Sequence, residues 1–231
     1  MKHYIASWSG TASSVTLIDA MGDEDRICQV ARISYNREDA KEGSRLIAFL
    51  LEQKHMSPFE HVEFEFFIHT PIPIRTQLFR HRTASPNELS GRFVSAKDSG
   101  IYFPNAPMDL QGRLQSLYEA SLELYSDLLA SGIPREVSRM VLLQGQMTKF
   151  YFKVNARSLI NIFEQRLSDH AQYEMVELAT MMFNAFEHIL PTVAERFTWM
   201  HPVLYSNILK LRKGIVKEED PWNPKIKGVM K

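Results

Sequence analysis

The architecture of this chain follows from one stretch, Val62-Glu63-Phe64-Glu65-Phe66-Phe67-Ile68-His69. Every second residue from Val62 to Ile68 is apolar and lies on one face, which is typical of a half-buried strand. A second run, Lys149-Phe150-Tyr151-Phe152-Lys153-Val154, alternates in the same way. We therefore predict two strands that look antiparallel and that each bury one face.

Much of the remaining chain has a helical pattern. We expect helices over about 24–34, 44–53, 114–131, 134–143 and 171–190, and one more beginning near Asn155. Residues 14–19 predict a short strand, Pro58 breaks the chain, Pro71 and Pro73 end the central strand, and Pro191 stops the last helix. Because helices and strands mix without regular β-α-β alternation, we predict the α+β class, with a mixed or antiparallel central sheet flanked by helices and a helical portion. We expect a single domain over residues 1–231.

The composition narrows the class of protein. The chain has 27 Lys and Arg and 27 Asp and Glu, so its formal net charge is zero, whereas a general nucleic-acid binder usually carries a basic excess. There is no run of about 18 apolar residues and no signal-peptide pattern, so we expect a cytoplasmic protein without a membrane span. Cys28 is the only cysteine, so an intrachain disulfide or a cysteine metal cluster is excluded. Its apolar neighbours predict a packing role, so we do not expect Cys28 to act as a catalytic nucleophile.

Functional groups are densest in Arg80-His81-Arg82-Thr83-Ala84-Ser85-Pro86-Asn87-Glu88-Leu89-Ser90-Gly91-Arg92. A packed core excludes this mixture because every buried charge or polar atom needs a partner. Arginine forks fit phosphate or carboxylate, and Ser90-Gly91-Arg92 resembles a small phosphate cradle. The alternative is an exposed, salt-bridged loop, but the variety of donor types favours a site.

A second polar cluster is Asn155-Ala156-Arg157-Ser158-Leu159-Ile160-Asn161, and it continues to Arg166 and His170. At about 100° per helical residue, Arg157 and Asn161 share one face, and Arg166 and His170 share a face roughly opposite. Such a helix would not simply lie on one core, and one interpretation is a helix wedged between two ligand sites or between subunits. The other, which these residues alone favour, is a surface helix with Asn155 as an amide N-cap.

The third constellation is the polar loop His55-Met56-Ser57-Pro58-Phe59-Glu60-His61. Its spacings match no familiar metal-ligand motif, so we expect no metal site. The chain also has no Gly-x-Ser-x-Gly elbow, Walker loop or Gly-x-Gly-x-x-Gly turn. Chemistry without an evident nucleophile or metal indicates a bound cofactor, and the available forks, amides and hydroxyls suit a nucleotide or dinucleotide.

The pattern Arg80-His81-Arg82-x-x-Ser85-x-Asn87-Glu88-x-Ser90-x-Arg92 resembles the signature of flavin-dependent thymidylate synthases. Further blocks resemble that family's blocks in its order, and the resemblance covers about 31–174. These blocks are His55-x-Ser57-Pro58-Phe59-Glu60-His61, Pro134-Arg135-Glu136-Val137, Asn155-Ala156-Arg157-Ser158-Leu159 with Asn161, and Asp169-His170-Ala171-Gln172. The resemblance implies an enzyme that methylates dUMP to dTMP, with methylenetetrahydrofolate as carbon donor and FAD reduced by NADPH. It also implies that no cysteine acts as nucleophile, and that homotetramers build active sites from several subunits.

The resemblance also implies roles for individual residues. Arg166 activates the uracil by favouring ionisation at N3, as a charged fork beside a developing anion. His55 lines the face where folate and nicotinamide stack, and orients these rings rather than transferring protons. The implied dUMP contacts are Gln77, Arg80, Glu88, Leu89, Ser90, Gly91, Arg92, Arg139 and Arg166. The implied flavin contacts are Ser57, Arg80, His81, Arg82, Glu88, Asn155, Arg157 and Asn161.

Some positions depart from the family's commonest pattern. Phe93 stands where many members have Tyr, and Gln165 where an apolar residue is frequent. Residues 94–104 match poorly, and we expect a mobile loop near the site, while the tail from Lys213 matches nothing. Two other functions stay open: a nucleotide-binding module without catalysis, which holds dUMP or a nucleic-acid end, and a flavin reductase that oxidises NADPH without methylating dUMP.

Overall fold

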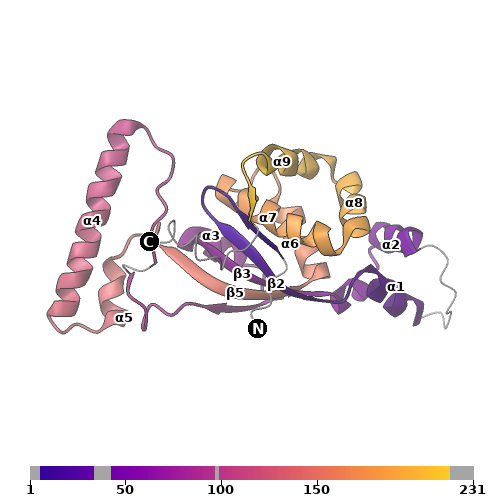
Figure 1. Cartoon of the computed structure of the whole chain (residues 1–231), viewed down its shortest axis with the longest axis horizontal. Helices are drawn as coiled ribbons and strands as arrows, with labels where there is room; N and C mark the ends of the chain where they lie inside the picture. Colours follow the sequence, from indigo (N-terminus) through magenta and orange to yellow (C-terminus); the bar gives the residue numbers. More distant parts are fainter. Residues whose placement is uncertain (1–5, 34–42, 97–98, 219–231) are drawn as a thin grey trace.

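The computed structural model describes residues 6–33, 43–96 and 99–218, and at its centre is a six-stranded sheet (Figure 1). The strand order is β4-β5-β3-β2-β1-β6, and each neighbouring pair is antiparallel. The α+β class predicted from the sequence is confirmed. In chain order the strands are β1 (Ala6–Ser9), β2 (Ser14–Met21), β3 (Glu63–Pro71), β4 (Ser85–Glu88), β5 (Met147–Asn155) and β6 (Val216–Glu218).

The two alternating stretches form neighbouring strands at the middle of the sheet. Phe64, Phe66 and Ile68 of β3 are fully buried, and the β5 residues that pair with them are buried as well. The residues between them point to the opposite face, as the pleat requires. There the rings of Phe67 and Tyr151 lie 5.2 Å apart, and Tyr151 is 41% exposed. One apolar face and one partly exposed face explain why the alternation was readable in the sequence.

Helices from the C-terminal half cover the buried face of the sheet (Figure 1). Phe186 of α7 packs on Phe64 of β3 with ring centroids 5.7 Å apart, and Phe163 of α6 meets Phe183 at 5.2 Å. Such aromatic pairs add to the stabilisation that comes from removing apolar area from water. The helices are α6 (Ala156–Arg166), α7 (Tyr173–Ile189), α8 (Pro191–Met200) and α9 (Pro202–Arg212).

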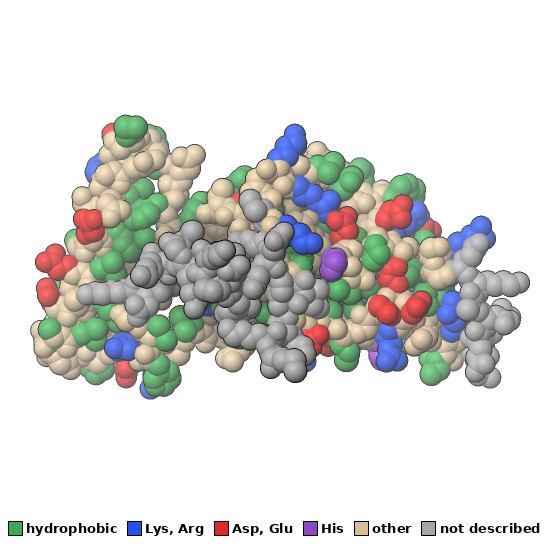
Figure 2. Space-filling model, viewed as in Figure 1, with side chains coloured by type: hydrophobic (Ala, Val, Ile, Leu, Met, Phe, Trp, Pro, Cys, Tyr) green, Lys and Arg blue, Asp and Glu red, His purple; other side chains and the backbone are tan. Residues whose placement is uncertain are grey.

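The other helices and two 3-10 turns lie at the two ends of the sheet. At the end where β5 finishes are α1 (Glu24–Ile33), α2 (Gly43–Glu52) and the 3-10 turn η1 (Ser57–His61). At the end where β5 begins are α3 (Ile72–Leu78), α4 (Met108–Ala130), α5 (Arg135–Ser138) and the 3-10 turn η3 (Arg139–Val141). In Figure 1, α4 stands away from the sheet. Figure 2 shows carboxylates on its outer edge and apolar side chains on the edge that faces the sheet.

A buried carboxylate joins the helical layer to the sheet. Glu177 of α7 is only 2% exposed and accepts hydrogen bonds from the backbone N–H of Thr11 (2.7 Å), the Thr11 hydroxyl (2.8 Å) and the N–H of Ala12 (3.0 Å). These groups belong to the turn between β1 and β2. A Cβ on Gly10 would lie 2.4 Å from the Glu177 carboxyl carbon, so a residue without a side chain is required there.

The predicted helices are present, with corrections at their ends. The helix predicted over 134–143 is wrong in length: α5 ends at Ser138, and the chain continues as the 3-10 turn η3 until Leu142, whose backbone is extended and ends the helical path. The helix predicted from 24 ends at Ile33, and its last expected residue, Ser34, lies outside the described residues.

Proline positions explain two features of the chain path. The strand ends at Pro71 as predicted, and Pro73 lies in the first turn of α3, where a missing N–H costs nothing. Pro191 stops α7 as predicted and also begins α8. The strands β1, β4 and β6 and the helices α3, α8 and α9 were not predicted. No helix of residues 6–33, 43–96 and 99–218 is long and apolar enough to cross a membrane.

Candidate active site

Residues 88–91, near the C-terminal end of the polar signature, line a cavity of about 440 Å³ at the junction of β4, α3, β5 and η3. This volume lies within the range of pockets that bind small molecules, about 300–1,000 Å³. The predicted residues Glu88, Leu89, Ser90, Gly91 and Arg139 therefore meet at one cavity, although they come from two distant parts of the chain. Its other polar walls include Arg75, Thr148 and Gln146.

Glu88 ends β4, and one of its carboxylate oxygens is already held by the protein. Thr148 Oγ1 donates to Glu88 Oε1 at 2.7 Å, and Arg75 Nε lies 3.1 Å from the same oxygen. The β4–β5 register, with Glu88 opposite Phe150, puts Thr148 on the same face of the sheet as Glu88. The second oxygen, Oε2, is the one that Glu88 can offer to an N–H or O–H group of a ligand.

Ser90 organises the turn that follows β4. Its hydroxyl accepts from the N–H of Arg92 at 3.3 Å, and its carbonyl accepts from the N–H of Phe93 at 3.0 Å. Gly91 lies against Arg139, since a Cβ at this position would be 3.2 Å from Arg139 Nη1. The missing side chain thus lets the guanidinium approach the turn, and a hydroxyl and a cation share one wall of the cavity.

Arg166 is the last residue of α6, and it contacts residues that lie in and just after α3. Its Nε donates to His81 Nε2 at 3.0 Å and its Nη2 to the Gln77 carbonyl at 3.4 Å. Burial of His81, with the positive charge of Arg166 beside it, lowers the pKa of this imidazole from 6.5 to about 4. His81 is therefore neutral at pH 7, and it orients Arg166 without compensating the guanidinium charge.

The predicted residues of α6 lie at the opposite end of β5. Asn155 caps the helix, because its Oδ1 accepts from the N–H of Ser158 at 2.8 Å. The N-cap considered from the sequence is confirmed. Arg157 forms an ion pair with Glu60 of η1, and both side chains are about half exposed. Asn161 also lies on the exposed side of this helix.

His55 and Ser57 connect α2 to η1 near this end of β5. They line a smaller cavity, about 170 Å³, together with residues of α1 and α2. The ring of Phe49 packs edge-on against His55 with centroids 5.8 Å apart. Arg80 and Arg82 are exposed in the turn after α3, so their guanidinium groups face solvent.

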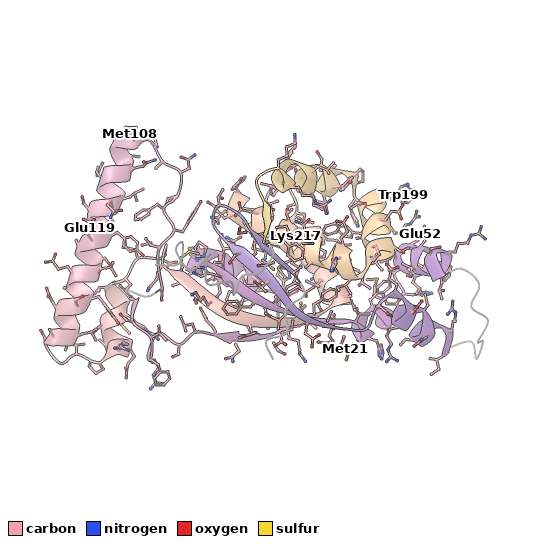
Figure 3. All side chains as sticks on the ribbon, in the orientation of Figure 1. Met21, Glu52, Met108, Glu119, Trp199 and Lys217 are labelled. Atoms are coloured by element: carbon pink, nitrogen blue, oxygen red, sulfur yellow. The ribbon has the colours of Figure 1, made fainter. Side chains whose placement is uncertain are left out.

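The predicted site residues thus form two clusters on one chain. Thr148 and Asn155 mark them on β5, and seven residues of strand separate these positions by roughly 23 Å at about 3.3 Å per residue. In Figure 3, Glu119 on α4 lies toward the cluster with the 440 Å³ cavity, and Glu52 on α2 toward the other. Each cluster contains some of the residues predicted to bind dUMP or FAD. Within one chain, these residues do not all surround a single site.

Two expectations for α6 are corrected by the structure. Arg166 and His170 do not share a helical face, because α6 ends at Arg166 and His170 lies in the following turn. The helix also lies on the core, with Leu159, Ile162 and Phe163 fully buried. Its apolar face is continuous enough to pack on α7, so functional groups gather on the exposed side and at the two helix ends.

The positions that depart from the family pattern are near the clusters. Phe93 is 77% exposed beside Arg92, and Arg135 donates to its carbonyl at 2.9 Å. Gln165 Nε2 donates to Asn161 at 2.9 Å, so the unusual amide contacts a predicted flavin residue.

Of the stretch 94–104, residues 97 and 98 lie outside the described part of the chain. The described part is tied to the start of β5, where Met147 N–H donates to the Gly100 carbonyl at 3.1 Å.

Sequence reasoning missed several polar residues of the site. Arg75 and Thr148 hold Glu88, yet neither belongs to a quoted motif, and only the strand register brings Thr148 beside it. Gln172 was quoted within a block but received no role, although it bonds to Gln77 at 2.7 Å. Arg75 and Gln77 lie on the short helix α3, which escaped prediction because Pro71 and Pro73 were read only as the end of the strand.

Cys28 packs as predicted, and it is not part of either cluster. It is 3% exposed on α1, and burial raises the pKa of its thiol. A raised pKa leaves little thiolate at neutral pH, so Cys28 is a poor nucleophile. Among the residues that the structure describes, no three His, Cys, Asp or Glu side chains gather as a metal site.

The fold and the site define an α+β protein with a polar cavity suited to an anionic small molecule. Residues 16–192 match the model of the thymidylate synthase complementing protein, and the chain belongs to this family, that of the flavin-dependent thymidylate synthases. The resemblance read from the sequence is confirmed.

Individual relatives agree with this membership. The flavin-dependent thymidylate synthase of Thermotoga neapolitana is 38% identical, over 79% of this chain and 89% of the relative. That of a strain of Thermus thermophilus is 34% identical, over 77% of this chain and 72% of the relative. Among solved structures, a UMP/dUMP methylase, PolB, from Streptomyces cacaoi bound with 5-Br dUMP is 31% identical. It has a TM-score of 0.74 and covers 81% of this chain and 95% of its own.

Proposed function

We propose that this enzyme methylates dUMP to dTMP, with methylenetetrahydrofolate as carbon donor and FAD reduced by NADPH as hydride source. One observation carries the proposal: Glu88, Ser90, Gly91 and Arg139 converge on one cavity. In its crystal structure PolB, a relative of this chain, was bound with 5-Br dUMP. A hydroxyl and a guanidinium group on one wall suit a nucleotide monophosphate.

In this proposal Ser90, Gly91, Arg92 and Arg139 hold the dUMP phosphate, and Gln77, Arg80, Glu88 and Leu89 complete the nucleotide pocket. Arg166 activates the uracil. It is held by a neutral ring and a backbone carbonyl, so its charge is available to stabilise ionisation at N3. Uracil ionised at N3 is more nucleophilic at C5, which attacks the methylene carbon, and no enzyme thiol is needed.

The second cluster suits FAD by its donor set. Guanidinium groups fit a pyrophosphate, and Arg80 and Arg82 are exposed and available for one. The remaining proposed flavin contacts are Ser57, His81, Glu88, Asn155, Arg157 and Asn161. FAD, when bound, supplies the hydride that reduces the transferred carbon to a methyl group. His55 sits at an exposed loop with its ring fixed by Phe49, and we assign it to the orientation of folate and nicotinamide.

We further propose that residues 1–231 act as a single domain within a homotetramer that shares its active sites. The roughly 23 Å between the clusters along β5 supports this, because one subunit's first cluster would then meet another subunit's second. Leu110, Leu117 and Leu124 also support it: they recur every seven residues on α4 and are 39%, 56% and 48% exposed. A heptad stripe of exposed leucines is typical of a helix that packs on another helix.

The test is dTMP formation by the purified protein, supplied with dUMP, methylenetetrahydrofolate, NADPH and FAD and followed by chromatography. We expect turnover in the unmodified protein and a loss of about 100-fold or more in Arg166→Ala, the range for removing a preorganised charge donor. The flavin absorbance of Arg166→Ala should persist. NADPH oxidation without dTMP would favour the flavin reductase, and a colourless protein that binds dUMP but no FAD would favour the non-catalytic nucleotide binder.

A further inference from the structure

Four polar side chains form a hydrogen-bonded chain beside Arg166. Gln77 Nε2 of α3 donates to Gln172 Oε1 at 2.7 Å, and Gln172 Nε2 donates to Glu174 Oε2 at 2.9 Å. Tyr102 donates its hydroxyl to the other oxygen, Glu174 Oε1, at 3.1 Å. The chain therefore links α3, the start of α7 and the segment before α4. The hydrogen-bonded chain begins at Gln77, and the backbone carbonyl of this residue accepts a hydrogen bond from Nη2 of Arg166.

The carboxylate sets the direction of the whole chain. An ionised carboxylate only accepts hydrogen bonds, whereas a glutamine amide has one accepting and one donating end. Glu174 must therefore receive the NH2 group of Gln172, which turns the Gln172 oxygen toward Gln77. Gln77 must therefore donate its own NH2 group to the Gln172 oxygen. Amide orientations follow from such networks, and this network has one consistent solution.

We propose that Glu174 is a positioning residue that makes Gln77 present its carbonyl oxygen, rather than its NH2 group, to the nucleotide. The ligand group recognised would be an N–H or O–H donor of dUMP, in its base or its ribose. This inference rests on the proposed function, because it names dUMP as the occupant. In this inference Glu174 and Gln172 do not contact the substrate. They act only by fixing the orientation of Gln77, which does.

Tyr102 supports the direction from the far end of the chain. Burial, together with its hydrogen bond to Glu174, raises the pKa of Tyr102 to about 12. The phenol thus keeps its proton at neutral pH and can donate to the carboxylate. The backbone of Tyr102 is also held, with its N–H donating to the Gly145 carbonyl at 2.9 Å. Glu174 is therefore anchored on both oxygens.

The first test is Glu174→Gln in the FAD-loaded, full-length enzyme, with dUMP binding measured by calorimetry. The new amide allows the chain to reverse, so Gln77 can offer an NH2 group to a ligand donor. We expect the dissociation constant for dUMP to rise roughly threefold to tenfold, as for one neutral hydrogen bond. Tyr102→Phe is the matched control: Glu174 still only accepts, the direction is kept, and we expect a change below about twofold.

The second test reverses the chain deliberately. Gln77→Glu alone sets two accepting oxygens against each other and should weaken dUMP binding. In the double variant Gln77→Glu with Glu174→Gln, Gln172 can turn over, donate to the new carboxylate on α3 and accept from the new amide on α7. An accepting oxygen again faces the nucleotide, and we expect at least threefold recovery of affinity, about the value of one hydrogen bond. Gln77→Glu with Glu164→Gln restores the same net charge on α6, outside the chain, and should not recover.

The outcomes separate the two proposals. If the unmodified holoenzyme does not bind dUMP, the proposed function fails. If it binds dUMP but Glu174→Gln binds equally well, or the double variant shows no recovery, the positioning role of Glu174 is wrong while the proposed function stands. Equal losses in Tyr102→Phe and Glu174→Gln would also overturn it, because direction would then not matter.

Discussion

How well each arginine can serve an anion depends on the partner that it already has. Arg157 is paired with Glu60, and Arg75 lies beside Glu88, so a ligand at either fork competes with a carboxylate. Arg166 differs, because within the described residues its recorded partners are the neutral ring of His81 and a backbone carbonyl. A guanidinium whose charge is not cancelled stabilises a developing anion best. This supports the role in uracil activation that the resemblance implies for Arg166.

Arg92 provides a test of the phosphate assignment at the scale of one side chain. In Arg92→Ala we expect dUMP binding to weaken by about 1.5–3 kcal/mol, the contribution of a hydrogen bond to a charged group. Calorimetric titration with dUMP measures this. Arg26→Ala on α1, which removes an exposed guanidinium at the other end of the molecule, is the control and should leave binding unchanged. An unchanged dissociation constant in Arg92→Ala would remove Arg92 from the phosphate site.

His69 predicts a pH dependence of stability. Burial, with Lys149 opposite on β5, lowers its pKa from 6.5 to about 4. Between these values the unfolded chain binds the proton more readily, so stability is lost as the pH falls from 6.5 towards 4. We expect a smaller fall in melting temperature over this window for His69→Gln than for the unmodified protein. His81 shares the shift, so some loss should remain.

Thermal melts in buffers from pH 7 to pH 4 measure this difference. His188→Gln, which removes an exposed histidine of α7, is the control and should keep the slope of the unmodified protein. Equal slopes for His69→Gln and the unmodified protein would mean that His69 does not resist protonation in the fold.

At the scale of elements, β5 does more than bury phenylalanines. Its first residues meet the 440 Å³ cavity, and its last residue caps α6. A strand between two neighbouring strands holds two groups of side chains at a set separation, because each residue advances about 3.3 Å and the neighbouring strands fix its direction. The burial of β5 in the core thus has two consequences. It produces the apolar alternation seen in the sequence, and it fixes the distance between the two clusters.

Glu177 gives a prediction for the contact between α7 and the β1–β2 turn. In Glu177→Ala three hydrogen bonds are lost, and we expect a decrease of about 3 kcal/mol in the free energy of unfolding, since an unsatisfied buried donor costs about 1–3 kcal/mol. Denaturant unfolding measures it. Thr11→Val removes only the hydroxyl bond and should cost about 1 kcal/mol. Similar small losses in both variants would mean that the carboxylate is not the main link.

Two strands that escaped prediction, β4 and β6, lie at the edges of the sheet. β4 is Ser85–Glu88, four residues with no alternating apolar face, and it becomes a strand because the edge of β5 offers hydrogen bonds. β6 pairs with β1 in the same way. Edge pairing depends on a partner far along the chain, whereas β3 and β5 show their pattern locally. The α3 helix was hidden because prolines were read as breakers only.

At the scale of the whole molecule, the leucine stripe of α4 tests the shared active site. Leu117→Asp places a charge in the proposed helix contact, and we expect the proposed tetramer to dissociate, as measured by light scattering after size exclusion. Ser116→Asp adds the same charge one residue away, about 100° around the helix, and should leave the assembly intact. If sites are shared, Leu117→Asp should also lose dTMP formation. A Leu117→Asp tetramer would exclude this stripe from the interface.

The α+β class, the two central strands, most helices and the candidate site residues could be predicted from the amino-acid sequence. They could be predicted because alternation, helical spacing and polar density are local properties of the chain. Which of these residues meet depends on the folded chain. Folding brings Arg139 to Gly91, Thr148 to Glu88 and His81 to Arg166, and it keeps the α6 cluster at the far end of β5. Strand register and helix length set those distances, and both depend on packing between segments that no single stretch of sequence contains.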